Sequence, residues 1–158
     1  MSHHTDDDGF TMIELLVTIS VLGIMMAIAV TGWSSWTKAR QQSGTAREVE
    51  SVLRQTQQRA VTEARDLCVR FETNGLDYST YTGECDNSPV KTAGPLRAAS
   101  GDARITSPSF QGRHSTGGGV TFYARGTASK GTVQVTRVGQ SKVYIIDVEG
   151  LTGRVSVS

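Results

Sequence analysis

The sequence predicts an α+β fold, in which a long N-terminal helix packs by its second half on an antiparallel C-terminal β-sheet or small β-sandwich. Two observations support this fold class. Residues 10–65 contain no proline, and their apolar residues have the spacing of a helix. From residue 67 onward, short alternating runs are separated by Gly, Ser and Asn, which is typical of strands and turns. At 158 residues, the chain has room for one modest globular domain and one anchor.

The expected helix starts with an apolar run, "FTMIELLVTISVLGIMMAIAV", over residues 10–30. This run is long enough to span a bilayer, and Glu14 is its only charged residue. A charge at bilayer depth costs about 2.5–3.5 kcal/mol on insertion scales, so Glu14 is a candidate functional residue. The alternatives are a single-pass anchor that tolerates the acid and a buried core helix. A secretory signal fits less well, because no basic region precedes the run and no small-residue cleavage site clearly follows it.

The second half of the helix is expected to be amphipathic. Small or apolar residues recur at steps of three, four and seven, on one helix face: Ala39, Ala46, Val49, Leu53, Thr56, Ala60 and Leu67. Charged and amide side chains between them predict a solvated face: Arg47, Glu48, Glu50, Arg54, Gln55, Gln58, Arg59 and Glu63. A helix of about 55 residues would be roughly 80 Å long at 1.5 Å per residue. Its apolar stripe has to pack on the rest of the chain.

The remaining segments predict strands. "LCVRFETNGLDYSTYTGEC" alternates apolar and polar residues on both sides of Asn74-Gly75, a strong hairpin signal. The segment 86–100 is predicted to be a loop. Five further strands are expected at 103–107, 119–124, 132–138, 142–148 and 153–157.

Charge and cysteine content restrict the function only weakly. The formal net charge of +1 favours no class of partner, although residues 86–158 hold nine Lys/Arg and four Asp/Glu. Cys68 and Cys85 could form one disulfide or remain two buried thiols. Their spacing is not that of a CxxC pair, so thioredoxin-like and metal sites are disfavoured.

The sequence predicts no enzyme, no cofactor and no metal site. His114 lies beside Ser115 in a Gly/Ser-rich segment that is more typical of a loop than of a catalytic pair. No His, Cys and carboxylate residues have the spacing of metal ligands. The "TGGGV" segment lacks the Lys-Ser/Thr of a phosphate-binding loop and does not begin a helix.

The stretch "GFTMIELLVTISVLGIMMAIAV" resembles the N-terminus of type IV pilins and type II secretion pseudopilins. These proteins share a short leader ending in Gly, then Phe, Glu at the fifth mature position and an apolar helix. The strands "VTFYARG", "GTVQV" and "GRVSV" resemble the all-β domain of the GspH/FimT branch of minor pseudopilins. The pilin-like organisation implied is a leader at 1–9, a transmembrane and polymerisation helix at 10–32, its amphipathic continuation at 33–66, and a β-rich domain at 67–158.

The resemblance also implies roles for three residues. A prepilin peptidase would cut between Gly9 and Phe10, and the new amine of Phe10 would be methylated. Residues one and five of a helix share a face, so Glu14 could meet such an amine in its own subunit or in a neighbour. A paired charge is much less costly than an unpaired one in an apolar filament core. The implied protein is a non-enzymatic minor subunit of a type IV pilus or type II secretion pseudopilus, with other pilins, the peptidase and the inner membrane as partners.

Charge and resemblance predict opposite orientations in the membrane. Lys38 and Arg40 follow the apolar run and no Lys or Arg precedes it, which by the positive-inside rule places the C-terminal domain in the cytoplasm. The family is single-pass in the inner membrane with this domain outside, and a Cys68–Cys85 bridge would fit an oxidising exterior. We expect the second orientation. Thr31 stands where pilins often carry Pro, which fits a minor pilin or pseudopilin better than a major pilin.

The alternative function is a DNA-binding minor pilin that acts in DNA uptake. Some FimT-type pilins bind DNA through a C-terminal Gly-Arg-x-Arg element. Gly153 and Arg154 match it, but Ser156 stands at the second Arg position. Four other basic residues could contact phosphates: Arg125, Lys130, Arg137 and Lys142. Asp147 and Glu149 are close in sequence, so a mixed solvated surface is the competing interpretation.

Overall fold

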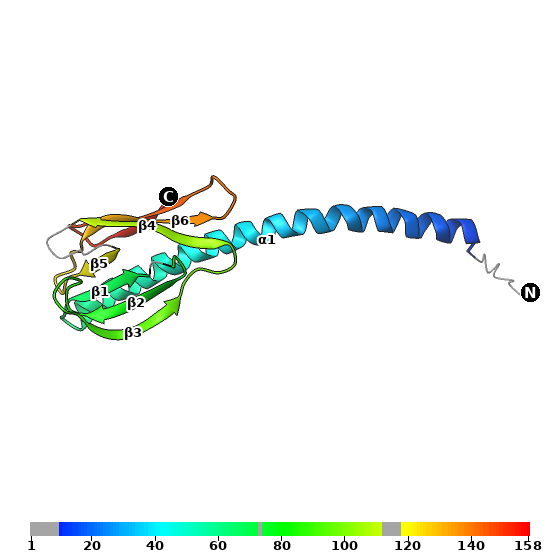
Figure 1. Cartoon of the computed structure of the whole chain (residues 1–158). Helices are drawn as coiled ribbons and strands as arrows, with labels where there is room; N and C mark the ends of the chain where they lie inside the picture. Colours follow the sequence, from blue (N-terminus) through cyan, green and yellow to red (C-terminus); the bar gives the residue numbers. More distant parts are fainter. Residues whose placement is uncertain (1–9, 73, 112–117) are drawn as a thin grey trace, which may run out of the picture. The chain divides into compact units, whose positions relative to one another are not determined.

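The computed structural model describes residues 10–72, 74–111 and 118–158. The chain divides into two compact units, Met1–Thr37 and Lys38–Ser158. The helix α1, Met12–Thr62, includes residues of both units, and eight strands follow it in the described part of the chain. Figure 1 shows the order of these elements. The predicted α+β class is therefore confirmed.

The first unit contains the apolar start of α1. Thr11 precedes the helix, and its hydroxyl Oγ1 accepts a hydrogen bond from the backbone N–H of Glu14 at 3.3 Å. This contact satisfies one of the N–H groups that a helix start leaves without an internal partner. The segment Met12–Ala29 is long and apolar enough to cross a membrane, and none of it is buried within the chain. A helix that is apolar on all sides needs an apolar environment around it.

In the second unit, α1 contributes one face to a core that it shares with both sheets. The predicted stripe is confirmed at five positions that are buried: Ala46, Val49, Leu53, Thr56 and Ala60. The prediction was wrong for Leu67, which is buried but belongs to the first strand, after the helix has ended. It was also wrong for Ala39, which is exposed because the packed part of the helix starts about one turn later. Gln42 and Thr45 are buried there instead, and Gln42 Nε2 donates to the carbonyl of Val135 at 3.2 Å.

The helix ends at Thr62 through a local turn of the backbone. Arg65 N–H donates to the carbonyl of Ala60, and Ala64 N–H donates to that of Val61. Ala64 has a φ of 49°, the left-handed conformation that this type of helix end requires. The chain then enters the first strand within three residues.

The first sheet has the order β3-β2-β1-β5. Its strands are β1 (Leu67–Phe71), β2 (Asp77–Thr82), β3 (Val90–Arg97) and β5 (Gly119–Phe122). The predicted Asn74-Gly75 hairpin is confirmed, because β1 and β2 are antiparallel and Gly75 has a φ of 67°. Asn74 Oδ1 accepts hydrogen bonds from the N–H groups of Leu76 and Asp77, which stabilises the turn.

The second sheet has the order β4-β6-β7-β8 and is antiparallel throughout. Its strands are β4 (Ala103–Gln111), β6 (Lys130–Arg137), β7 (Tyr144–Val148) and β8 (Val155–Val157). The five later strands predicted from the sequence are thus confirmed, with shifted ends. Figure 1 shows the part of α1 after Lys38 running alongside strands of both sheets.

The prediction of a loop over 86–100 was wrong, because this segment contains β3. The strand is at the edge of its sheet, and almost all of its residues are exposed. Its sequence therefore lacks the alternation of a half-buried strand, and it includes Pro95, which edge strands tolerate.

Candidate functional site

The residues expected to act in assembly lie at the start of α1. Phe10 is 80% exposed, and Glu14 is exposed in the first helical turn. A carboxylate in that turn interacts favourably with the positive end of the helix dipole. No ion pair involves Glu14 among the described residues, so its carboxylate remains available to a partner. Gly9 and the expected leader lie outside the described residues.

Thr11 is a residue of this segment that the sequence reasoning missed. It holds the backbone N–H of Glu14, while the side chain of Glu14 takes no part in that hydrogen bond. The signal was present, since a Thr followed three residues later by Glu is the pattern of a capping box. The helix start is therefore fixed by the backbone of Glu14, and its carboxylate can serve another purpose.

Cys68 and Cys85 form a disulfide in the structure, with a Cα–Cα distance of 5.2 Å. Cys68 belongs to β1 and Cys85 follows β2, so the bridge closes a loop around the first hairpin. The backbone N–H of Cys85 donates to Thr121 Oγ1 on β5 at 3.1 Å. In the chain-entropy description, closing a loop of this size by a disulfide adds about 3 kcal/mol to the free energy of unfolding.

The six residues considered for DNA binding are divided between the two ends of the second sheet. Arg137 and Lys142 flank one end of the β6–β7 pair, and Lys130 lies at the other end of β6. A strand of this length separates its ends by about 23 Å. At the Lys130 end, the pairing places Glu149 between Lys130 and Arg154 on adjacent strands. The two cations therefore share one hollow with Glu149 and Asp147.

Gly153 and Arg125 belong to the same end as Arg154. A Cβ on Gly153 would lie 2.6 Å from the carbonyl oxygen of Gly126, so only glycine fits there. Arg125 lies over the ring of Tyr123, 5.1 Å from its centroid. Burial raises the pKa of Tyr123, and nearby Glu84 and Asp66 raise it further despite the opposing hydrogen bond to Ser129 and the charge of Arg125. The ring is thus a neutral phenol at physiological pH.

Arg137 points toward the interior rather than into solvent. It follows Val133 and Val135 at steps of two on β6, and both of these valines are buried. Its Nη1 is buried and has no hydrogen-bond partner among the described residues. Arg137 is therefore poorly placed to bind DNA.

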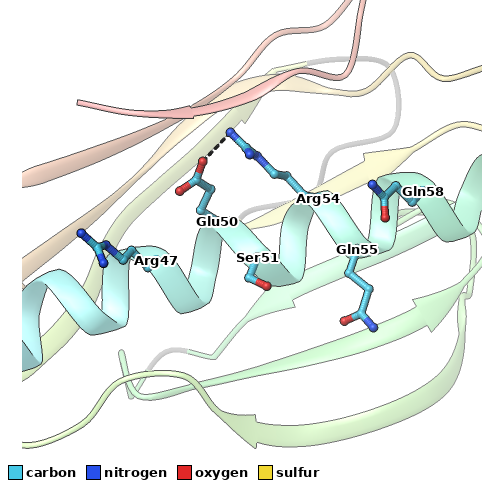
Figure 2. A pocket seen from close by; sticks show the side chains of 6 residues that line it. All are labelled: Arg47, Glu50, Ser51, Arg54, Gln55 and Gln58. Atoms are coloured by element: carbon cyan, nitrogen blue, oxygen red, sulfur yellow. Dashed lines mark ion pairs between the residues drawn. The ribbon is translucent and has the colours of Figure 1, made fainter.

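The exposed face of α1 in the second unit is polar. A shallow hollow along it is lined by Arg47, Glu50, Ser51, Arg54, Gln55 and Gln58 (Figure 2). Glu50 and Arg54 form an ion pair at 2.5 Å, and Arg54 also donates to the carbonyl of Val155 at 3.1 Å. A second hollow that includes Arg54 and Gln58 continues to Arg154. These side chains could form hydrogen bonds with another protein surface. Within the described ranges, no group of His, Cys, Asp and Glu could hold a metal ion.

Comparison with known proteins gives two family matches. Residues 6–30 match the family described as prokaryotic N-terminal methylation motif. Residues 45–152 match the family described as type II transport protein GspH. No curated protein matches the chain significantly.

Two minor pilin and pseudopilin structures share this fold. The type IV minor pilin FimU from Pseudomonas aeruginosa (strain PAO1) is 17% identical, with a TM-score of 0.57 over 78% of this chain and 92% of FimU. The minor pseudopilin EpsH from the type 2 secretion system of Vibrio cholerae is 12% identical, with a TM-score of 0.53 over 72% of this chain and 92% of EpsH. Since the GspH match spans most of the chain, the chain belongs to the GspH family of type II transport proteins and is a non-enzymatic minor pilin or pseudopilin that carries a prepilin-processing motif.

Proposed function

We propose that this protein is a structural subunit of a type II secretion pseudopilus or type IV pilus, anchored in the inner membrane before assembly. Met12–Ala29 would be the single membrane span and residues 38–158 would lie outside the cytoplasm. The observation that carries the proposal is the position of Glu14, an acid with no ion-pair partner in the described chain, in the first turn of an uncovered apolar helix. Other pilins would cover that helix in the filament.

The proposed orientation has support from the disulfide. Disulfides persist in oxidising compartments and are rare in the cytoplasm. A bridge between Cys68 and Cys85 would therefore form in a unit located outside the cytoplasm. The domain division that follows is a leader at 1–9, a membrane and polymerisation segment at 10–32, its continuation to about residue 66 and the β-rich part from residue 67.

The first expected result is cleavage after Gly9, with an N-methylated Phe10 as the new terminus. The reason is the Gly-Phe-x-x-x-Glu pattern directly before an apolar span. Intact-mass analysis of the membrane-extracted protein, from cells with and without an active prepilin peptidase, measures this directly. A mature mass that still includes residues 1–9 in the presence of the peptidase would contradict the assignment.

We propose DNA binding in uptake as the second candidate, because Arg154, Lys130 and Arg125 lie toward one end of the second sheet. Contacts to phosphates would make the binding independent of sequence and weaker with salt, with a slope of about −0.9 per phosphate neutralised on duplex DNA. Glu149 opposes this function, since it lies between Lys130 and Arg154 in the strand register.

Gel-shift titration of residues 38–158 tests the second candidate. We expect dissociation constants above about 1 μM at physiological salt, as in non-specific binding. Arg154→Ala should weaken the binding, while Ser156→Arg should strengthen it by restoring the Gly-Arg-x-Arg pattern. Submicromolar binding by the unmodified unit that is lost in Arg154→Ala would make the DNA receptor the leading function.

A further inference from the structure

The positive charge of the second unit is concentrated at the end where the chain enters from the apolar segment. Three segments meet there, 38–45, 98–104 and 135–144, and they hold five Lys/Arg residues and one acid, Asp102. The rest of residues 38–158 is nearly balanced, with eleven Lys/Arg and ten Asp/Glu. Most of the net charge of the unit thus belongs to this end.

Direct contacts hold the three segments together. Lys38 Nζ lies 3.3 Å from Asp102 Oδ2, and the N–H of Val138 donates to the carbonyl of Asp102 at 3.1 Å. Gln42 Nε2 donates to the carbonyl of Lys142 at 2.7 Å. The connection between β6 and β7, residues 138–143, is therefore fixed to the first turns of the packed part of α1.

The β6–β7 connection combines exposed apolar and basic side chains. Val138 is 68% exposed and Val143 is 38% exposed. Lys142 is exposed, and its Nζ lies 4.9 Å from the centroid of the Tyr144 ring. Exposed valines beside a lysine are suited to the boundary between lipid headgroups and acyl chains, where apolar groups insert and cations stay at the surface.

The length of the chain keeps this end near the membrane. Nine residues lead from Ala29, where the apolar span ends, to Lys38, and a helix of that length rises only about 14 Å. The headgroup layer covers about 5–8 Å of this distance. The Debye length at physiological ionic strength is about 8 Å, so attraction to anionic headgroups still acts across the part of this distance that lies beyond the headgroup layer.

We propose that this end of the unit, the basal surface, docks on anionic phospholipid headgroups. The basal surface consists of Lys38 and Arg40 of α1, Arg104 of β4, and Val138 and Lys142 at the β6–β7 connection. Docking would hold the unassembled subunit against the membrane. The basal surface would detach from the lipid headgroups when the subunit is extracted into a filament. This inference rests on the membrane anchoring proposed above.

The test uses the full chain in lipid nanodiscs, with an environment-sensitive fluorophore on Gln140→Cys. Discs of phosphatidylcholine are compared with discs that contain phosphatidylglycerol. We expect a blue-shifted emission only in the anionic discs, and we expect this blue shift to disappear at high salt. The same fluorophore on Leu151→Cys, an exposed site far from residue 140 in the second sheet, should not respond to the lipid.

Charge variants supply the matched control. Removing two basal charges in Arg40→Gln/Lys142→Gln should lower the ratio of docked to undocked protein about 25-fold, since each basic residue near such a surface contributes about fivefold. Lys91→Gln/Lys130→Gln removes the same charge from exposed positions outside the basal surface and should leave the ratio unchanged.

Co-elution with the discs separates failure of docking from failure of anchoring. A chain that co-elutes but whose residue-140 emission is the same in both lipids contradicts docking and leaves anchoring intact. A blue shift that depends on protein concentration and not on lipid charge also contradicts it, because the basal surface would then bind protein. A chain that does not enter discs of either composition contradicts the anchoring, and the docking with it.

Discussion

Glu14→Ala should leave the protein inserted and folded but remove it from filaments. In a filament, apolar helices would enclose both the carboxylate of Glu14 and the amine of Phe10. Removing the carboxylate would leave the amine as an unpaired charge in apolar surroundings, which is strongly unfavourable. We expect incorporation to fall by at least about a hundredfold, the effect of breaking a buried charge pair. The amount of protein in sheared filaments measures incorporation, and the amount in membranes measures insertion.

Two control variants separate charge from local structure. Glu14→Gln keeps the size of the side chain and should fail in assembly as Glu14→Ala does. Thr11→Val removes the hydroxyl that holds the N–H of Glu14 and should cost about 1 kcal/mol of helix stability while retaining assembly. Filament levels of Glu14→Ala equal to those of the parent would rule out the proposed pairing.

Leu53→Ala should strongly destabilise the second unit. Leu53 is 0% exposed and lies on α1 within the core that joins the helix to both sheets. Replacing a buried leucine by alanine costs about 2.7–5 kcal/mol, according to how far the surroundings collapse into the cavity. For a unit of this size the melting temperature should fall by about 10–20 °C, as thermal unfolding monitored by circular dichroism would measure.

Val61→Ala is the matched control on the same helix. Val61 is 50% exposed, so losing its methyl groups should change stability by no more than about 0.5 kcal/mol. Equal shifts for Leu53→Ala and Val61→Ala would contradict the assignment of the buried helix face.

The fold was predictable wherever the signal is local. Asn74-Gly75 specifies its turn through the side chain of Asn74 and the positive φ of Gly75, both of which depend on neighbouring residues only. The buried face of α1 followed from helical spacing. Gln42 was missed because a buried amide is accepted only when distant carbonyls, here those of Val135 and Lys142, receive its hydrogen bonds.

The candidate site shows the same limit. Phe10 and Glu14 could be found from the sequence because their roles depend on spacing within one helix. The arrangement of Lys130, Glu149 and Arg154 depends on the register of three strands, which the sequence alone does not provide. The three segments that hold the basic residues of the basal end are likewise far apart in sequence, and only the packing of β4, β6 and α1 brings them together.

The exposed edge of β3 affects how copies of this protein can associate. An open strand edge can pair with its counterpart in another copy and lead to disordered aggregation. Pro95 removes one N–H from this edge, and in an antiparallel pairing centred on Gly94 each Lys91 would oppose an Arg97. Association of copies through this strand edge is thus disfavoured. In the filament proposed above, ordered polymerisation would therefore depend on contacts between helices.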